Sequence, residues 1–598
     1  MGGEREGGGE RLGRALGLAP PFAALTIGWA VWAVLLASAL SSAALIRFRG
    51  TQALFLLTQD APLLLLAIVL TFAVGWIPAA WAQRLSSWRF GAGRAPPLAL
   101  AGLVLIVGLL GSRLVFQGYL LSLDEFLADF DARIFASGHL TAPIPGPWRP
   151  FAPALQPIYM LPVPSHDMWA SAYLPVHAAL RALAHRVGAA PWLNPVLSAF
   201  SVVAVWGVAR RLWPAQPGMA VGAAALLATS SQLLVTGMTG YAMPAHLAFN
   251  LAWLWLFLLG GRLGHVGALA MGFLATGLHQ MLFHPLFAAP FVVQLWVERR
   301  WRLAGVYTLA YAAICGFWIE FFRLELGWMG EASKAAASAG GGWLFERASA
   351  ALANVKPGNV SALALSLVRF AAWQNPLAPP LIVLGTGAAL RAKGHLRSLV
   401  LGAALTLFVT ALVVPSQTQG WGYRYLHGLL GSISLVAAWA WGRLTFPLAA
   451  PERAAANGAF AAACAASLLL QTSLHAWQVW TYVRPYAAAN AMVQAAREPV
   501  VVIDNNRPWF DMGVVVRNDP FLIAGPKVML LAALDEPQVR LLCGRGPVAV
   551  FDGAQALALG ADTVEAPPDP NAVRLRGVMA QLKCGRPLIR RIAGNPER

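Results

Sequence analysis

Long apolar segments recur through the first 480 residues and restrict this chain to a lipid bilayer. A helix of about 17 to 25 apolar residues is long enough to cross the hydrocarbon core. With 58% hydrophobic and 12% charged residues and a mean hydropathy of +0.60, the chain is too apolar for a set of soluble domains. We therefore predict a polytopic α-helical membrane protein with about thirteen transmembrane helices. The segments lie near residues 21–46, 61–82, 97–117, 190–209, 218–237, 243–260, 264–279, 283–298, 303–322, 374–390, 398–415, 425–442 and 456–475.

The basic residues of the connecting loops predict how the helices are oriented. Most loops expected on the side of the N-terminus carry arginine or lysine. Of the short loops on the opposite side, those near 238–242 and 280–282 carry none and that near 416–424 carries Arg424 alone, whereas Arg47 and Arg49 in the first outer loop are exceptions. This asymmetry is typical of a chain whose basic loops face the cytoplasm. It also accounts for much of the formal net charge of +18 without nucleic-acid binding, which we exclude. We predict a multi-pass protein of the cytoplasmic (inner) membrane with a cytoplasmic N-terminus and an extracytoplasmic C-terminus.

The same assignment of spans and loops divides the chain into three regions. Residues 1–20 form a basic cytoplasmic tail, and residues 21–480 form the transmembrane domain with long outer loops at 118–189 and 323–373. Residues 481–598 are predicted to form a small extracytoplasmic α/β domain. Amphipathic helices are expected at 168–185 and 361–372 within the loops, and strands at 500–504, 520–525 and 547–553 within the C-terminal domain.

An acidic stretch follows the third predicted span. The sequence LDEFLADFDARIFASGHL at 123–140 brings Asp124 and Glu125 to the outer membrane surface, where a carboxylate is costly unless it has a function. On a helix these two side chains point about 100° apart, and Asp131 returns to the face of Asp124 two turns later. For Glu125 and Asp129 the alternative is a solvated helix face, with Asp129 paired to Arg133 four residues on.

This stretch, together with W-x-S-x-Y-x-P at 169–175 and WLNPVLS at 192–198, resembles the first outer loop of the GT-C integral-membrane glycosyltransferases. The resemblance is to bacterial members related to protein mannosyltransferases and aminoarabinose transferases. It implies transfer of a sugar from a polyprenyl-phosphate donor to a lipid, glycan or protein acceptor. Asp124 is then the candidate catalytic base, with Glu125 beside it, and Tyr173 is a candidate substrate-binding residue.

Asp167 and His166 precede the predicted helix at 168–185. Asp167 is a second candidate for substrate binding, because the resembled family often places another carboxylate in an outer loop. The alternative is that Asp167 caps the helix expected to begin at Met168.

Two further segments contain residues that could bind the phosphate of the lipid donor. Arg424 and Tyr423 lie in SQTQGWGYRYLHG at 416–428, and an arginine at the outer mouth of a helix suits a lipid phosphate. The alternative is a snorkelling arginine in an aromatic belt. His279 and His284 lie in HQMLFHP; they are either phosphate or acceptor contacts or histidines with internal hydrogen bonds.

The sequence contains no motif that identifies a cofactor, and its cysteines allow two interpretations. The spacing of the two histidines is not that of a helical zinc pair, so no metal site is predicted, although assistance by a divalent metal stays open. P-loop, G-x-G-x-x-G, H-E-x-x-H and G-x-S-x-G motifs are absent from the sequence. In an oxidising compartment Cys543 and Cys584 would form a disulfide; the alternative is two buried free thiols.

Two other functions compete with the glycosyltransferase. A transporter or flippase of a lipid-linked or polar solute would place ionisable residues or helix breaks near the middle of the membrane. A polysaccharide ligase or polymerase would use the same donor. Because the notable ionisable residues cluster at outer ends of spans, surface chemistry is favoured. The predicted partners are the lipid donor, the acceptor and membrane lipids.

Overall fold

A computed structural model describes the structure of this chain. It describes residues 20–41, 55–86, 94–156, 158–330, 349, 353, 357–392, 394–413, 417, 420–504, 512–561 and 567–588. Most of the predicted tail at 1–20 and the KAAASAGGGW run within loop 323–373 lie outside these residues.

The chain forms two compact units. The first comprises Met1–Gly111, Pro191–Ile319 and Gly341–Gln478, and the second comprises Ser112–Ala190, Glu320–Gly340 and Val479–Arg598. Each unit therefore draws on three separate parts of the sequence. The long segment after the third span shares a unit with the C-terminal region, so these two parts fold together.

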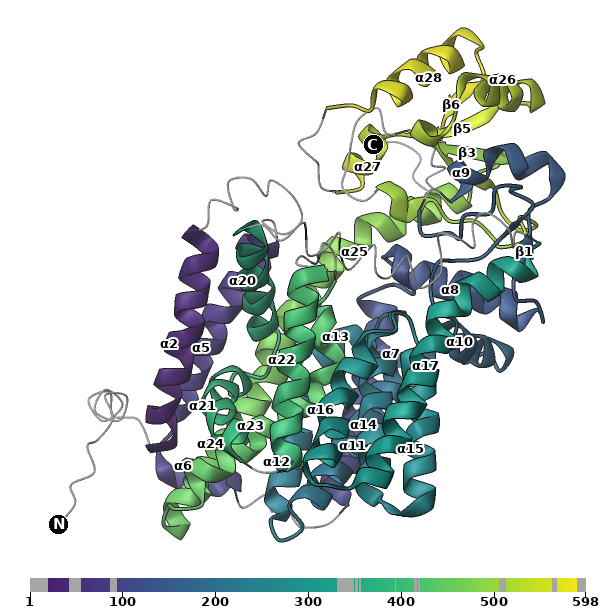
Figure 1. The fold of residues 1–598 in the computed structure, drawn as a ribbon. Coiled ribbons are helices and arrows are strands. Elements are labelled where there is room, and N and C mark those ends of the chain that lie inside the picture. Colours follow the sequence, from purple (N-terminus) through teal and green to yellow (C-terminus); the bar gives the residue numbers. More distant parts are fainter. Residues whose placement is uncertain are drawn as a thin grey trace, which may run out of the picture. The chain divides into compact units, whose positions relative to one another are not determined.

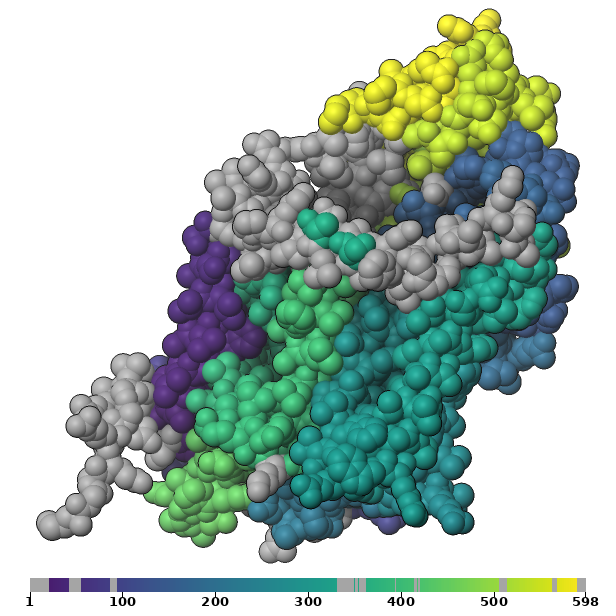
Figure 2. All heavy atoms as spheres, viewed as in Figure 1, coloured from purple at the N-terminus to yellow at the C-terminus, as the bar shows by residue number. Residues whose placement is uncertain are grey.

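The first unit is helical throughout its described residues (Figure 1). Figure 2 shows one face of this unit with all heavy atoms as spheres, and on that face the atoms of neighbouring helices touch. Its helices are α2 (Pro20–Ser41), η1 (Leu56–Asp60), α5 (Ala61–Gly75), α6 (Ala79–Ser86), α7 (Ala95–Leu114), η3 (Ala190–Trp192), α11 (Leu193–Leu212), α12 (Pro217–Ala228), α13 (Ser231–Gly237), α14 (Met243–Leu259), α15 (Gly261–Thr276), α16 (Phe283–Val297), α17 (Trp301–Trp328), α20 (Pro357–Ala372), α21 (Ala378–Arg391), α22 (His395–Val413), η4 (Arg424–Leu429), α23 (Leu430–Thr445), α24 (Ala450–Ala466), η5 (Ser467–Gln471) and α25 (Thr472–Gln494). Helices α7, α17 and α25 each continue into the second unit.

The prediction of a polytopic helical membrane protein is confirmed, whereas the count of about thirteen spans is not. Each predicted span overlaps a helix. In the described part of the chain, seven helices are long and apolar enough to cross a membrane, or eight if a bent pair is one span. The bent pair is α12 with α13, which meet at 56°. Several of the remaining helices are shorter than the roughly 20 residues needed to cross the membrane.

The second unit joins the segment after α7 to a parallel sheet. Its elements are α8 (Leu123–Ala136), β1 (Ala142–Pro143), η2 (Gly146–Phe151), α9 (Ala152–Leu155), β2 (Met168–Trp169), α10 (Val176–Arg186), β3 (Val500–Ile503), η6 (Met512–Val515), β4 (Lys527–Leu530), η7 (Leu531–Ala533), α26 (Glu536–Arg545), β5 (Val548–Phe551), α27 (Gly553–Ala558), α28 (Pro570–Gln581) and β6 (Gly585–Pro587). Buried side chains of α8, such as Phe130 and Ile134, belong to the same hydrophobic core as Val502, Met529 and Val550 of the sheet. One core therefore stabilises both parts of this unit.

The sheet has the strand order β4-β3-β5-β6, with every pair parallel. The small C-terminal α/β region is thus confirmed, but one predicted strand is wrong. Residues 520–525 form a turn in which the backbone of Leu522 and Gly525 has positive φ (52° and 66°), a conformation that a strand excludes. The strand of this region is β4, two residues later.

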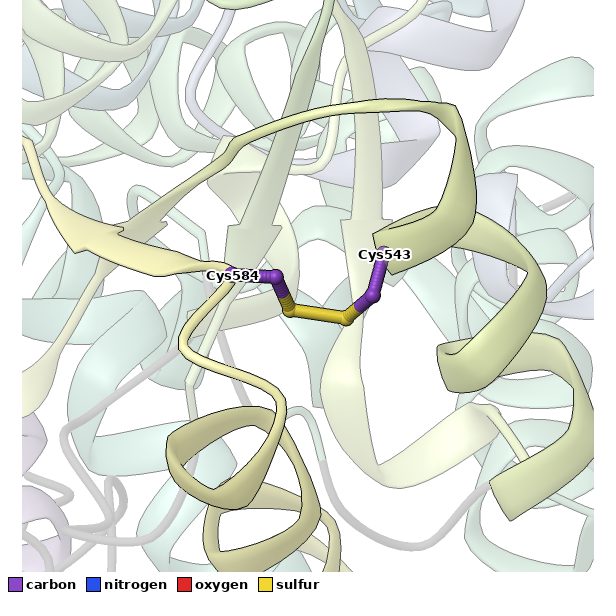
Figure 3. The surroundings of a disulfide bond; sticks show 2 residues. All are labelled: Cys543 and Cys584. Atoms are coloured by element: carbon purple, nitrogen blue, oxygen red, sulfur yellow. A yellow bond between two sulfur atoms is a disulfide. The ribbon is translucent and has the colours of Figure 1, made fainter.

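A disulfide joins the end of α26 to the residue before β6 (Figure 3). Its cysteines are Cys543 and Cys584, the pair considered from the sequence, with Cα atoms 5.4 Å apart. Their separation of 41 residues means that the bond closes a long loop of the α/β region.

Candidate active site

The acidic helix α8 begins with a capping box. The hydroxyl of Ser122 accepts the backbone N–H of Glu125 at 3.2 Å, and the carboxylate of Glu125 accepts the N–H of Ser122 at 2.9 Å. These two bonds satisfy backbone donors that would otherwise be orphaned at the helix start. Glu125 is fully buried, so the solvated face considered for it is wrong. Its observed contacts stabilise the helix, and a catalytic role for Glu125 remains a prediction without support from this geometry.

Asp124 differs from the other three carboxylates of α8. It is half-buried, whereas Glu125, Asp129 and Asp131 are buried. The hydroxyl of Tyr173 donates a hydrogen bond of 2.5 Å to its Oδ1 atom. Asp124 is therefore the carboxylate of this helix that combines a fixed orientation with access from outside.

Asp131, two turns further on, is bonded to the same segment as Asp124. Both the backbone N–H of Ser171, at 3.1 Å, and its hydroxyl donate to the Asp131 carboxylate. Burial raises the pKa of Asp131 to about 6, although the two bonds from Ser171 act in the opposite direction. Glu325, in the last turn of α17, is also buried and near enough to repel Asp131.

Asp129 lies in a cluster of basic side chains. The Arg181 guanidinium donates to it at 2.6 Å and Arg133 at 3.0 Å, and the His185 ring lies 2.8 Å away. Burial alone would raise the pKa of Asp129, but the His185 hydrogen bond and the two arginine charges together hold it well below its usual range. The expected pairing with Arg133 is present, but the solvated face is wrong because Asp129 is 3% exposed. Its role is to tie α8 to α10.

The W-x-S-x-Y-x-P segment lies along α8 and contacts it with alternate residues. The Trp169 ring packs edge-on against Phe130 at 5.2 Å, and Ser171 and Tyr173 bond Asp131 and Asp124. Alternation is what an extended backbone produces, since successive side chains point to opposite sides. The motif that carries the sequence resemblance therefore holds the acidic helix.

This extended segment contradicts the helix predicted at 168–185. Residues Met168 and Trp169 form β2, paired with β1, and the helix begins only at Val176, after Pro175. Asp167 consequently caps no helix at Met168, so that alternative is wrong. The Asp167 carboxylate, half-buried in a turn, accepts the hydroxyl of Ser165 at 2.5 Å.

A residue of the C-terminal region holds the start of α8, and the sequence analysis did not identify it. The buried guanidinium of Arg517 donates to the carbonyls of Leu120 and, at 3.0 Å, Leu121, directly before the capping box. It also lies over the rings of Tyr119 and Phe126, at 4.6 and 4.7 Å. Such an arginine fixes the backbone that leads into Asp124.

The donor-phosphate candidates all lie in the first unit. Arg424 begins η4, where its backbone N–H donates to the Gln417 side chain at 2.7 Å and its guanidinium lies 4.9 Å from the Tyr241 ring. Tyr423 is fully buried, and its carbonyl accepts from Gln232 at 2.9 Å. Arg424 also lines a small cavity with Met243, His246, Asn250, Phe283, Thr406, Tyr425, Gly428 and Leu429. The cavity has a volume of about 10 Å³, which is room for a water molecule and not for a phosphate group.

The two candidate histidines are both buried, His279 in the turn after α15 and His284 in α16. The His284 ring nitrogens lie 2.7 Å from the Asn250 amide oxygen and 2.7 Å from the Tyr311 hydroxyl. His284 therefore has hydrogen-bond partners inside the helical unit, as its alternative interpretation describes, although Asn250 links it to the wall of the cavity. Within the described residues, no three His, Cys, Asp or Glu side chains converge where they could hold a metal ion.

A buried ion pair in the first unit was not anticipated. The Arg369 guanidinium donates to Asp60 at 2.8 Å, and the Trp373 indole donates to the same carboxylate at 3.0 Å. The His475 ring stacks on Trp373 at 3.7 Å. Asp60 ends the π-helical turn η1, and π turns are frequent at functional positions. The two charged residues are 309 positions apart, so no local pattern could have paired them.

Comparisons with known proteins find likeness in structure alone. No family model matches the chain, and no curated protein sequence matches it. Two solved structures of ArnT from Cupriavidus metallidurans match over 72% of this chain, each with a TM-score of 0.47. The apo structure is 12% identical and covered over 84% of its length; the structure bound to undecaprenyl phosphate is 14% identical and covered over 85%.

ArnT is an aminoarabinose transferase of the GT-C type, which is the group that the sequence resembles. A likeness at this TM-score assigns no role to any residue of this chain.

Proposed function

We propose that this chain is a GT-C type glycosyltransferase that moves a sugar from a polyprenyl-phosphate donor to an acceptor at the outer face of the cytoplasmic membrane. The observation that carries the proposal is the environment of Asp124. It is the accessible carboxylate of α8, held by Tyr173 from the W-x-S-x-Y-x-P segment, the second of the three segments that carry the family resemblance. Two separate sequence motifs thus meet at one carboxylate.

Asp124 acts as the general base of the reaction. The carboxylate takes the proton of the acceptor hydroxyl or amine while the acceptor atom bonds to the anomeric carbon of the sugar. The bond between that carbon and the phosphate oxygen breaks, and the lipid phosphate leaves with the electron pair. Attack from the face opposite the leaving group inverts the anomeric configuration. The Tyr173 hydroxyl keeps the carboxylate aimed at the acceptor.

Arg424 is proposed to bind the departing phosphate. A guanidinium presents a fork of donors that matches phosphate oxygens and stabilises the charge that develops on them. The support for this role is the residue type and its place at the outer end of a predicted span, since the cavity that Arg424 lines holds no more than a water molecule. Tyr423, His279 and His284 are proposed as further contacts of the donor phosphate or the substrate, and Asp167 is proposed as an acceptor contact.

The proposed location is the cytoplasmic membrane, with the N-terminus inside and the C-terminus outside. The basic loops on the side of the N-terminus support this orientation. The disulfide between Cys543 and Cys584 supports an oxidising compartment for the C-terminal α/β region.

The test is transfer of radiolabel from a panel of polyprenyl-phosphate sugars to membrane acceptors. Asp124→Asn should reduce transfer by at least about a hundredfold, the size expected for loss of a general base. Glu536→Gln is the matched control, since this carboxylate is exposed on α26 and pairs with Arg540 and Arg574 at the surface. A folded Asp124→Asn protein with unchanged transfer would contradict the assignment of the base.

A transporter or flippase is the second candidate function. The bent pair α12–α13 and the buried ion pair Asp60–Arg369 are features that such a protein uses to bind a solute within the membrane. A polysaccharide ligase or polymerase would share the donor but attach a whole glycan. Solute movement across proteoliposomes that is unaffected by Asp124→Asn would favour the transporter.

A further inference from the structure

A wide groove in the first unit lies away from every residue assigned above. It is formed where α12 begins, α23 ends and α24 begins, and its cavity volume is about 790 Å³. This volume lies within the range of about 300 to 1,000 Å³ that ligand pockets occupy. By the orientation predicted from the loops, this end of the three helices faces the cytoplasm.

Small residues keep the groove open. Its floor and walls include Gly218, Gly222 and Ala225 of α12, and Ala438 and Gly442 of α23. A Cβ atom added at Gly222 would stand 3.9 Å from both Ala438 and Phe460 and would meet nothing closer. The lining is mostly apolar, and any side chain larger than alanine at Gly222 would extend against Ala438 of α23 and Phe460 of α24. We call the apolar space between the three helices the channel.

The polar mouth of the groove holds a cation without an acidic partner. Arg453 lines the groove, and its guanidinium donates to the carbonyl of Leu448 at 3.1 Å. Its Nε atom is buried with no hydrogen-bond partner, and no described carboxylate lies within ion-pair distance of it. The neighbouring Glu452 instead accepts the backbone N–H of Ala449 at 3.3 Å. Arg453 as a whole is half-buried, so its guanidinium presents a positive charge to the groove that a bound anion would balance.

We infer that the groove binds one anionic phospholipid of the cytoplasmic leaflet. Its phosphate accepts hydrogen bonds from Arg453, and one acyl chain lies along the channel between α12, α23 and α24. Arg443, at the end of α23, and Arg210 and Arg211, at the end of α11, add positive charge to the same predicted side of the membrane. Anionic headgroups are attracted to such basic clusters, whereas a zwitterionic lipid gains less.

The experiment is native mass spectrometry of the full-length protein after exchange into mild detergent with added phosphatidylglycerol or phosphatidylcholine. The wild type should retain one phosphatidylglycerol and at least tenfold less phosphatidylcholine. Arg453→Gln should reduce phosphatidylglycerol retention about tenfold. Gly222→Leu, which fills the channel without touching the cation, should reduce retention of the same lipid as strongly.

Arg391→Gln is the matched control, because Arg391 ends α21 on the same predicted side and does not line the groove. Equal retention of both lipids, a loss in Arg391→Gln as large as in Arg453→Gln, or full retention in Gly222→Leu would each overturn the inference. Preferential retention of a polyprenyl phosphate over phosphatidylglycerol would also overturn it and would assign the groove to the donor.

Discussion

Two carboxylates, Asp124 of the second unit and Asp60 of the first, show how different environments suit different tasks. Asp60 is 1% exposed and accepts from Arg369 and Trp373, so its charge is neutralised within the protein. Asp124 is half-buried and bonded to the neutral hydroxyl of Tyr173. A general base must remain able to accept a proton from a substrate, and a carboxylate paired with a buried arginine is poorly suited to do so.

The comparison shows that a cluster of Asp and Glu residues in the sequence does not by itself reveal which carboxylate is suited to catalysis. Helix α8 carries four carboxylates, yet Glu125 caps the helix, Asp129 pairs with basic residues and Asp131 is bonded to Ser171. These three buried groups hold the helix in place. Together they leave Asp124 as the half-buried member of the set, which supports its proposed role as the base.

The largest expected effect follows from breaking the ion pair of the first unit. Arg369→Leu leaves the Asp60 charge buried without its partner, which typically destabilises a protein by about 3 to 5 kcal/mol. The apparent melting temperature in detergent should fall accordingly. The double variant Asp60→Asn with Arg369→Leu should recover most of the loss. If the double variant is no more stable than Arg369→Leu, the ion pair is not the cause.

A smaller effect is expected from titrating Asp131. Its folded pKa of about 6 exceeds the ordinary value of 3.8, so the folded state binds this proton more tightly than the unfolded state. Its contribution to stability is therefore fully present below about pH 4 and is lost as pH rises through about 6, by about 3 kcal/mol in all. Thermal unfolding of wild type and Asp131→Asn from pH 4 to 7 should show a steeper fall in the wild type than in the variant. Parallel curves would contradict it.

The contact between Arg517 and the start of α8 allows a test of whether the position of Asp124 depends on this arginine. Arg517→Ala should lower kcat about tenfold with little change in KM, because the backbone before Asp124 loses its anchor while the donor site in the first unit is untouched. Arg517→Lys should recover part of the rate. A change in KM alone, or equal loss of rate in Arg545→Ala, which is exposed on α26, would refute the positioning role.

The smallest expected effect is that of Tyr173→Phe. Removing one hydrogen bond to Asp124 while keeping the ring should reduce transfer about five- to tenfold, corresponding to about 1 kcal/mol. The measurement is the steady-state rate of sugar transfer by the wild type and by Tyr173→Phe at equal protein concentration. A loss as large as that of Asp124→Asn would mean that Tyr173 itself takes part in proton transfer.

The sequence predicted what depends on local pattern. Apolar length identified the helices, and Asp124 was singled out by its place after a span. The Cys543–Cys584 pair was likewise proposed from the change in composition. The helices and the position of Asp124 are set by residues close together in the chain, whereas the two cysteines were paired because they alone lie in the polar C-terminal region.

The sequence analysis missed the contacts between residues that lie far apart in the chain. Arg517 contacts α8 across almost 400 residues, and Asp60 meets Arg369 across 309. The apolar run at 520–525 was expected to be a strand, but its positive φ angles belong to a turn. The burial of Glu125 was also missed, although Ser122 three residues before it is the sequence signature of a capping box.

The central claim is that Asp124 accepts the proton of the acceptor, and binding and transfer measured on one preparation test it most directly. Asp124→Asn should bind the polyprenyl-phosphate donor with unchanged Kd while transfer falls at least about a hundredfold. Unchanged transfer in the folded variant, or loss of donor binding in parallel with transfer, would contradict the account.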